Sequence, residues 1–223
     1  LTIGNYTGTS VKTYSYATIG GKTTSITTIN LPSHLAKINQ AAFGTQNAPH
    51  PITLNINPDA KNIQLARYAF IQSDFTSISL TSVKSIDTYA FANSDLLESV
   101  TIGTWPSSVK KIPDYTFYYC KALKSFDIPA HVTELGVSAF QYCGELTSIT
   151  LSNKVTKLGK YAFGGTGLTE ITLPAGLTDA NISGGYQFYG CSALKKVVFA
   201  EGSKITKIPL DMFYNCIELE DIN

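Results

Sequence analysis

The chain has 223 residues, of which 43% are hydrophobic and 15% are charged, so it can build a sizeable core but carries few surface charges. Its 17 basic residues against 16 acidic ones give a net charge of +1, and Arg67 is the single arginine. A surface that tracks phosphates needs clustered arginine and lysine, so this balance argues against a nucleic-acid partner. No apolar run reaches the roughly 18 residues of a membrane helix, which argues against membrane insertion.

Residues 1–24 differ in composition from the rest of the chain. They are rich in Thr, Ser, Gly and Tyr, and they lack the phenylalanine that marks every later segment. We expect them to form an amino-terminal cap built from short strands. The sequence therefore predicts a cap over 1–24 and a single repeat domain over 25–223.

From residue 25 onward the sequence repeats with a period of 21 to 27 residues, which is typical of leucine-rich repeats. The unit reads C-x-x-L-x-x-I-x-L-P-x-x-V-x-x-I-x-x-x-A-F, and the stretch from Cys143 to Phe163 follows it almost position for position. In some copies Ser or Thr replaces the cysteine. The marker phenylalanines are Phe43, Phe70, Phe91, Phe117, Phe140, Phe163, Phe188 and Phe213.

Each repeat contains a short segment in which apolar and polar residues alternate, such as Ile149-Thr150-Leu151, and this predicts a strand with its apolar residues inward. The remaining residues return the chain so that the next strand lies parallel. Because one repeat cannot bury its own apolar row, the repeats must stack and share a core. The predicted fold is an α/β-type, strand-dominated solenoid: a right-handed leucine-rich-repeat horseshoe of about eight repeats, with a parallel concave sheet and little regular helix.

Two insertions, at 103–107 and 200–203, lie just past a predicted strand and therefore on one rim of the horseshoe. Insertions in such places often carry binding in repeat proteins. The first contains Trp105, the only tryptophan, where packing demands it least, so we expect its ring to be exposed. At the other end, residues 216–223 stop inside a predicted strand, and we expect the chain to be a truncated piece of a longer protein.

The repeat unit resembles the BspA-like leucine-rich repeats of bacterial surface proteins. The resemblance rests on the eight copies above and covers about residues 25–223, with departures at Ser183 and in the long loop from Gly44 to Pro51. It implies a secreted or cell-surface protein, located outside the cell, that adheres to host proteins or to other bacteria. The particular ligand does not carry over, because members of the family differ in their partners.

No motif in the sequence predicts catalysis. The histidines His34, His50 and His131 lie in expected loops, and none is paired with a Ser or Cys in a recognisable motif. Paired carboxylates, a glycine-rich phosphate loop and the H-E-x-x-H pattern are all missing. We therefore expect no enzyme, no catalytic residue and no cofactor.

Cys120, Cys143, Cys191 and Cys216 share one repeat position, which Ser and Thr take in other copies. No C-x-x-C element or nearby histidine indicates a zinc site, so no metal is expected. Replacement by serine favours a column of buried structural thiols. The neighbours Cys120/Cys143 and Cys191/Cys216 could nevertheless reach bridging distance, so a disulfide stays an open alternative.

Two surfaces could contact a ligand. The concave face is flat, rich in hydroxyl groups and nearly uncharged. Its Ser and Thr residues either contact a ligand or are present only because they suit a solvated strand. Tyrosines recur beside the marker phenylalanine, and either form a ladder of stacked rings or offer contact area. The candidate contacts are Thr101, Asp127, Thr150 and Thr172 on the face, Tyr118, Tyr119, Tyr142 and Tyr189 beside the phenylalanines, and Trp105 on the rim.

These features predict a non-catalytic binding module of a secreted or cell-surface protein. The favoured ligand is a protein, such as a host matrix or surface glycoprotein. A carbohydrate-binding module, using aromatic rings and hydroxyl groups against a glycan, is one alternative. A structural spacer in a longer surface protein is the other.

Overall fold

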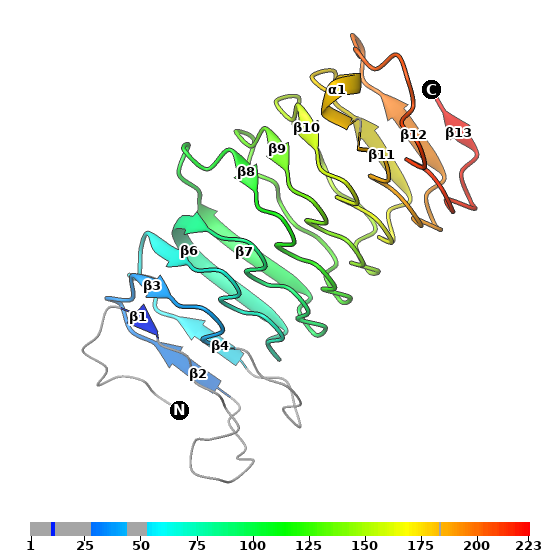
Figure 1. Cartoon of the computed structure of the whole chain (residues 1–223). Coiled ribbons are helices and arrows are strands. Elements are labelled where there is room, and N and C mark those ends of the chain that lie inside the picture. The colour runs from blue at the N-terminus through cyan, green and yellow to red at the C-terminus, as the bar shows by residue number, and fades with distance from the viewer. Residues whose placement is uncertain (1–9, 12–27, 44–52, 183) are drawn as a thin grey trace.

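The computed structural model describes residues 10–11, 28–43, 53–182 and 184–223. Most of the predicted cap over 1–24 lies outside these residues, and within it only the short strand β1 (Ser10–Val11) is described. The described chain winds into parallel turns, here called rungs, stacked from one end of an elongated molecule to the other (Figure 1). The predicted strand-dominated leucine-rich-repeat solenoid of about eight repeats is confirmed.

The alternating apolar segments form the first strand of most rungs, as predicted. These strands are β2 (Thr28–Leu31), β4 (Thr53–Ile56), the first part of β6 (Ser77–Ile86), β7 (Ser99–Thr104), β11 (Glu170–Leu173), β12 (Lys196–Phe199) and β13 (Asp221–Ile222). Their pairing is parallel and in register, with Ile78 opposite Val100 and Ile171 opposite Val197. We call their outer surface the first-strand face, which is the face that the sequence analysis assigned to the concave sheet.

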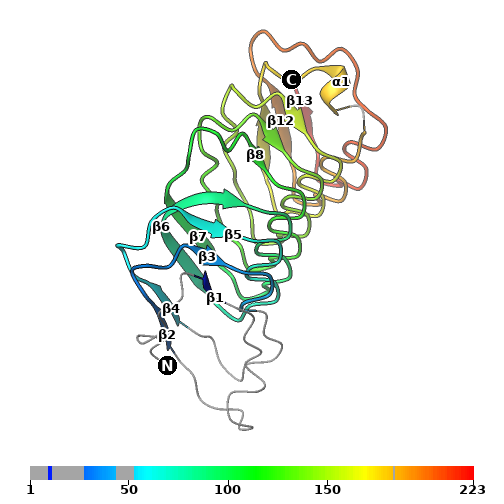
Figure 2. The same ribbon diagram turned by 60° about the vertical axis from the view of Figure 1, so that its left-hand side comes forward.

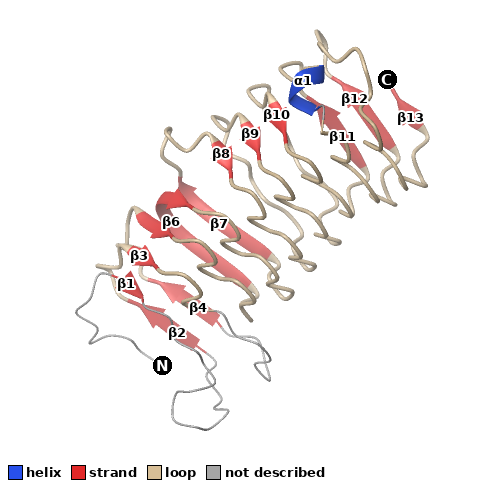
Figure 3. Ribbon diagram, viewed as in Figure 1, coloured by secondary structure: helices blue, strands red, loops and turns tan. Residues whose placement is uncertain are grey.

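Most rungs also contain a second short strand, which the sequence analysis did not predict. These strands are β1, β3 (Lys37–Ile38), β5 (Ile63–Leu65), the end of β6, β8 (Lys111–Ile112), β9 (Glu134–Leu135) and β10 (Lys157–Leu158). They pair in parallel and form a second-strand face (Figure 3). Strands of two or three residues are too short for an alternating pattern to be visible in the sequence.

The second strand is missing from two rungs at the carboxyl-terminal end of the described chain. In the Phe188 rung, where the usual Ile or Leu is missing, the short helix α1 (Asp179–Ile182) stands in its place and buries Ile182. In the Phe213 rung, Ile208 occupies the usual position but is 51% exposed. The first strand of that rung, β12, pairs with both β11 and β13, whereas the segment around Ile208 is the last of its kind in the described chain.

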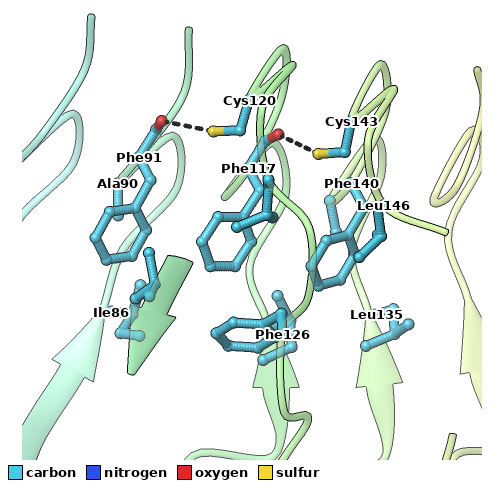
Figure 4. Packing of buried hydrophobic residues seen from close by; sticks show 14 of the residues in the cluster. Ile86, Ala90, Phe91, Phe117, Cys120, Phe126, Leu135, Phe140, Cys143 and Leu146 are labelled. Atoms are coloured by element: carbon cyan, nitrogen blue, oxygen red, sulfur yellow. Dashed lines mark hydrogen bonds between the residues drawn. The ribbon is translucent and has the colours of Figure 1, made fainter. Parts of the chain in front are cut away.

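The marker phenylalanines form one continuous stack inside the solenoid. Neighbouring ring centroids lie 5.1 to 5.7 Å apart along the whole series from Phe43 to Phe213. Phe140 is fully buried between Phe117 and Phe163, and Phe126 from a first-strand segment packs beside it (Figure 4). This stack is the apolar column that no single rung could bury alone.

Left-handed backbone flanks the phenylalanine of each rung. Among the described residues, the φ angle lies between 51° and 72° at the residue two before it and, from Phe70 onward, also at the residue two after it. The residues before are Ala41, Tyr68, Tyr89, Tyr115, Ser138, Tyr161, Tyr186 and Asp211, and those after are Gln72, Asn93, Tyr119, Tyr142, Gly165, Gly190 and Asn215. Because left-handed backbone costs a non-glycine residue roughly 1–2 kcal/mol, other interactions must hold this turn.

Backbone hydrogen bonds between rungs supply that support. In one interface the N–H groups of Tyr115, Phe117 and Tyr119 donate to carbonyl oxygens of the next rung, each at 2.8 Å. The acceptors are Val137, Ala139 and Gln141. The pattern recurs along the stack, so the Phe turns align along one edge of the molecule (Figure 2).

The cysteine column completes the turn. All four cysteines are free and buried. The thiol of Cys143 donates to the carbonyl oxygen of Phe117 at 3.1 Å, and that of Cys120 donates to Phe91 at 3.0 Å (Figure 4). Ser94 makes the equivalent bond to Phe70 at 2.8 Å, which explains why serine replaces cysteine in this column. Burial raises the pKa of the Cys143 thiol well above its usual value, so the group keeps its proton and remains a donor.

Removing one ring of the phenylalanine stack is expected to be costly. Phe140→Ala should lower the free energy of unfolding by roughly 3–5 kcal/mol, because it leaves a cavity between two stacked rings. Chemical denaturation followed by circular dichroism measures this change. Leu96, which is 42% exposed, provides the control, and Leu96→Ala should cost about 0.5 kcal/mol or less. Equal costs for the two variants would contradict the role of the stack.

The hydrogen bond from the cysteine column can be isolated by comparing two small substitutions. Cys143→Ser keeps a donor for the Phe117 carbonyl group, whereas Cys143→Ala removes it at nearly the same volume. We expect the alanine variant to be less stable than the serine variant by about 1 kcal/mol. Urea denaturation of the two variants tests this, and identical midpoints and slopes would show that the column acts by packing alone.

Candidate functional site

The first-strand face is interrupted near its middle, after β7. The chain takes 15 residues from Ile102 to Phe117 but only 12 from Ile128 to Phe140, so the first of these two rungs is longer. It continues as a strand to Thr104, whereas the next rung turns at Pro129, which has no N–H to donate. A single bridge, Ser99 to Ser125, joins the two segments, and neither 126–128 nor 148–151 is a strand.

Trp105 lies at this step in rung length. Its indole ring packs edge-to-face on Phe126 of the following, shorter rung, with ring centroids 6.2 Å apart, and it is half-buried against the core. The expectation of an exposed ring in a loose insertion was therefore wrong. Gly103 and Thr104 extend β7 instead of forming a loop, and this extension brings the ring over Phe126.

Two shallow hollows open where the strand pairing stops. The first, of about 400 Å³, is lined by Ile102, Gly103, Thr104, Trp105, Asp127, Ile128, Pro129 and His131, and we call it the Trp105 hollow. The second, of about 290 Å³, is lined by Ser125, Phe126, Asp127, Ile128, Ala130, Ser148, Ile149, Thr150 and Ser152. Asp127 and Ile128 belong to both linings, so the hollows adjoin along one rung. The surface combines aliphatic and aromatic walls with hydroxyl groups and one carboxylate.

Two polar groups of the Trp105 hollow have no ion-pair or hydrogen-bond partner in the part of the chain that the structure describes. Asp127 is exposed, and within the described ranges no basic nitrogen lies within 4.0 Å of its carboxylate. The Nε2 atom of His131 is buried and has no hydrogen-bond partner among the described residues. Sequence reasoning left His131 in a loop without a role. The difference in length between the two rungs was the signal that could have located this site.

The structure brings some of the predicted face residues together. Thr101 on β7, Asp127 and Thr150 occupy successive rungs and are all exposed, and Trp105 shares the first hollow with Asp127. Thr150 shares the second hollow with Asp127. Thr172 lies one rung further along, on β11, opposite Val198, and lines neither hollow.

The tyrosine candidates lie at the other edge of the first-strand face, because the Phe turn precedes the first strand whereas Trp105 follows it. Tyr118, Tyr119 and Tyr142 pack against one another with ring centroids 4.5 to 6.1 Å apart. Tyr189 packs against Tyr161, Tyr186 and Tyr214. Of the two alternatives left open by the sequence, these contacts favour the ladder of packed rings, in which neighbouring rings cover much of each other's faces.

Cations cover further ring faces along this tyrosine edge. The guanidinium group of Arg67 lies 4.7 Å from the ring centroid of Tyr68 and 5.5 Å from that of Tyr89. The ammonium group of Lys160 lies 4.4 Å from the centroid of Tyr186. The most accessible ring among the four tyrosine candidates is that of Tyr142, which is 39% exposed. The structure therefore separates the tyrosine candidates from Trp105 and the face residues.

The described residues contain no candidate metal centre and no membrane-spanning helix. No group of three or more His, Cys, Asp or Glu side chains there could hold a metal ion. The one helix among the described residues, α1, has four residues and is too short to cross a bilayer.

Comparison with known proteins agrees with the architecture. The sequence profile of the BspA type leucine-rich repeat region matches six copies, over residues 9–143, 63–183 and 110–223. The chain belongs to this family. BspA-type repeats are typical of bacterial cell surfaces, and leucine-rich-repeat proteins generally mediate protein interactions.

Solved structures share the fold of this BspA-type chain. A leucine-rich-repeat protein from Bacteroides ovatus is 25% identical with a TM-score of 0.65, and the match covers 87% of this chain and 54% of that one. A leucine-rich cell-surface protein from Faecalibacterium prausnitzii is 24% identical with a TM-score of 0.51, covering 88% and 59%. The leucine-rich-repeat protein of T. pallidum is 21% identical with a TM-score of 0.56, covering 87% and 78%. The chain thus spans a little over half the length of the first two proteins. No curated protein matches it.

The Nε2 atom of His131, for which the described residues offer no hydrogen-bond partner, should reduce stability. His131→Leu removes a buried polar atom without a hydrogen bond, so we expect the free energy of unfolding to rise by about 1 kcal/mol. His131→Gln keeps a polar group in the same place and serves as the matched control, for which no gain is expected. Thermal denaturation of the three proteins measures the difference. A leucine variant less stable than the wild-type protein would show that His131 is satisfied in solution.

Proposed function

We propose that the chain is a non-catalytic binding module of a secreted or cell-surface protein, and that it adheres to surface proteins of a host or of other bacteria. The observation that carries this proposal is the pair of adjoining hollows in the first-strand face, between β7 and β11. The occurrence of BspA-type repeats on bacterial surfaces supports the location.

The form of the surface favours a protein ligand. The hollows are shallow and adjoin along an exposed face, whereas small-molecule sites are enclosed and bury most of their ligand. Protein interfaces combine an apolar centre with a polar surround, and here partly buried Ile128 and Ile149 lie among Ser125, Ser148 and Thr150. Trp105 adds an aromatic side chain of the type that dominates interface energetics.

The proposal can be tested with one rung that offers both a site variant and its control. Thr150 lies in the second hollow, and Thr156 is exposed beside β10 on the second-strand side of the same rung. The purified chain is passed over immobilised matrix glycoproteins and mucins at physiological salt, together with Thr150→Arg and Thr156→Arg. We expect saturable binding that Thr150→Arg weakens at least tenfold and Thr156→Arg leaves unchanged.

The other outcomes distinguish the alternatives. Binding that both variants retain would move the site away from the first-strand face. Competition by free oligosaccharide, with no binding to the deglycosylated proteins, would favour the carbohydrate-binding module. If the folded wild-type chain binds no protein of the panel, adhesion is contradicted and the structural spacer is favoured.

A further inference from the structure

Asp127 places a negative charge in a column of the first-strand face whose other residues are uncharged. The outward position in the middle of the first strand is occupied, rung by rung, by Asn30, Asn55, Ser79, Thr101, Asp127, Thr150, Thr172 and Val198. Asp127 is the only charged residue of this column. Its exposed carboxylate has no cationic partner in the described chain, whereas Asp95, Glu98 and Glu134 all form ion pairs.

The surroundings of this carboxylate are those of a cation site. Trp105 lines the same hollow, and its indole is the aromatic ring that attracts cations best. Ile102, Ile128 and Pro129 supply apolar walls that can pack against an aliphatic stem. The buried Nε2 atom of His131 adds a polar atom without a hydrogen-bond partner among the described residues.

We propose that the Trp105 hollow receives an arginine side chain of the protein ligand, so this inference rests on the proposed function and names the chemistry of its contact. A guanidinium group is planar, stacks on an aromatic ring and binds a carboxylate with two parallel hydrogen bonds. A lysine ammonium group is not planar, so it stacks less well on an aromatic ring and does not form the pair of parallel hydrogen bonds with a carboxylate. The Asp127 carboxylate binds the guanidinium group, and the Trp105 ring packs on its plane. The apolar walls contact the aliphatic part of the arginine side chain.

Trp105 itself provides the measurement, because it is the only tryptophan of the chain. N-acetyl-arginine methylamide is titrated into the purified protein while tryptophan fluorescence and the indole N–H resonance are followed. N-acetyl-citrulline methylamide, which has nearly the same shape without the charge, is the control probe. We expect a saturable change with the arginine probe and none with the citrulline probe at equal concentration.

Two variants assign the effect to the carboxylate. Asp127→Asn should raise the Kd of the arginine probe about three- to fivefold, in line with one exposed ion pair. Glu170→Gln removes another exposed carboxylate of the same face, outside both hollows, and should leave the Kd unchanged. Equal responses to the arginine and citrulline probes, no response of the folded protein to either, or an unchanged Kd for Asp127→Asn would each overturn the proposal.

The failure of this inference is distinguishable from the failure of the proposed function. If a panel protein binds and Thr150→Arg blocks it while Asp127→Asn does not, the adhesion surface stands and the arginine contact is wrong. If the arginine probe binds as expected but no panel protein does, the arginine contact stands and the proposed adhesion is contradicted.

Discussion

The turn around each marker phenylalanine is the constraint on which the rest of the solenoid depends. Left-handed residues on both sides of the phenylalanine allow alternate N–H groups to face the following rung. The same geometry directs the ring into the core, where it stacks on its neighbours, and aims its carbonyl oxygen at the cysteine or serine of the next rung. The backbone strain is offset because hydrogen bonds, ring stacking and the thiol contact all favour the same conformation.

Because this turn is nearly invariant, differences in rung length must be absorbed elsewhere. Three extra residues in the Phe117 rung lengthen β7 and place Trp105 over Phe126 of the rung that follows. The regular pairing between first strands ends at this step in length, and the Trp105 hollow opens there beside Asp127. The Trp105 hollow thus lies between two rungs that differ in length.

The periodic features could be predicted from the sequence, because each recurs in register and depends on its own rung. Ile78, Val100 and Phe140 are buried as their spacing indicates. The two-residue strands at Ile112 and Leu135 carry too little pattern to be recognised. Trp105 and His131 could not be placed either, because their burial depends on the length of the adjacent rung. The candidate tyrosines were identified as a repeating set, and a ladder of stacked rings was one of the two alternatives that the sequence left open; the ring contacts of Tyr119 and Tyr142 favour it.

The hydrogen bonds between Phe turns also give the stack a direction. In every such interface the N–H groups belong to one rung and the carbonyl oxygens to the rung that follows it. At this turn a rung therefore has a donor side and an acceptor side. A twofold axis would set donors against donors, so two copies that met end to end through this turn could do so only head to tail. Such heterologous contacts produce rings or open filaments, not closed dimers.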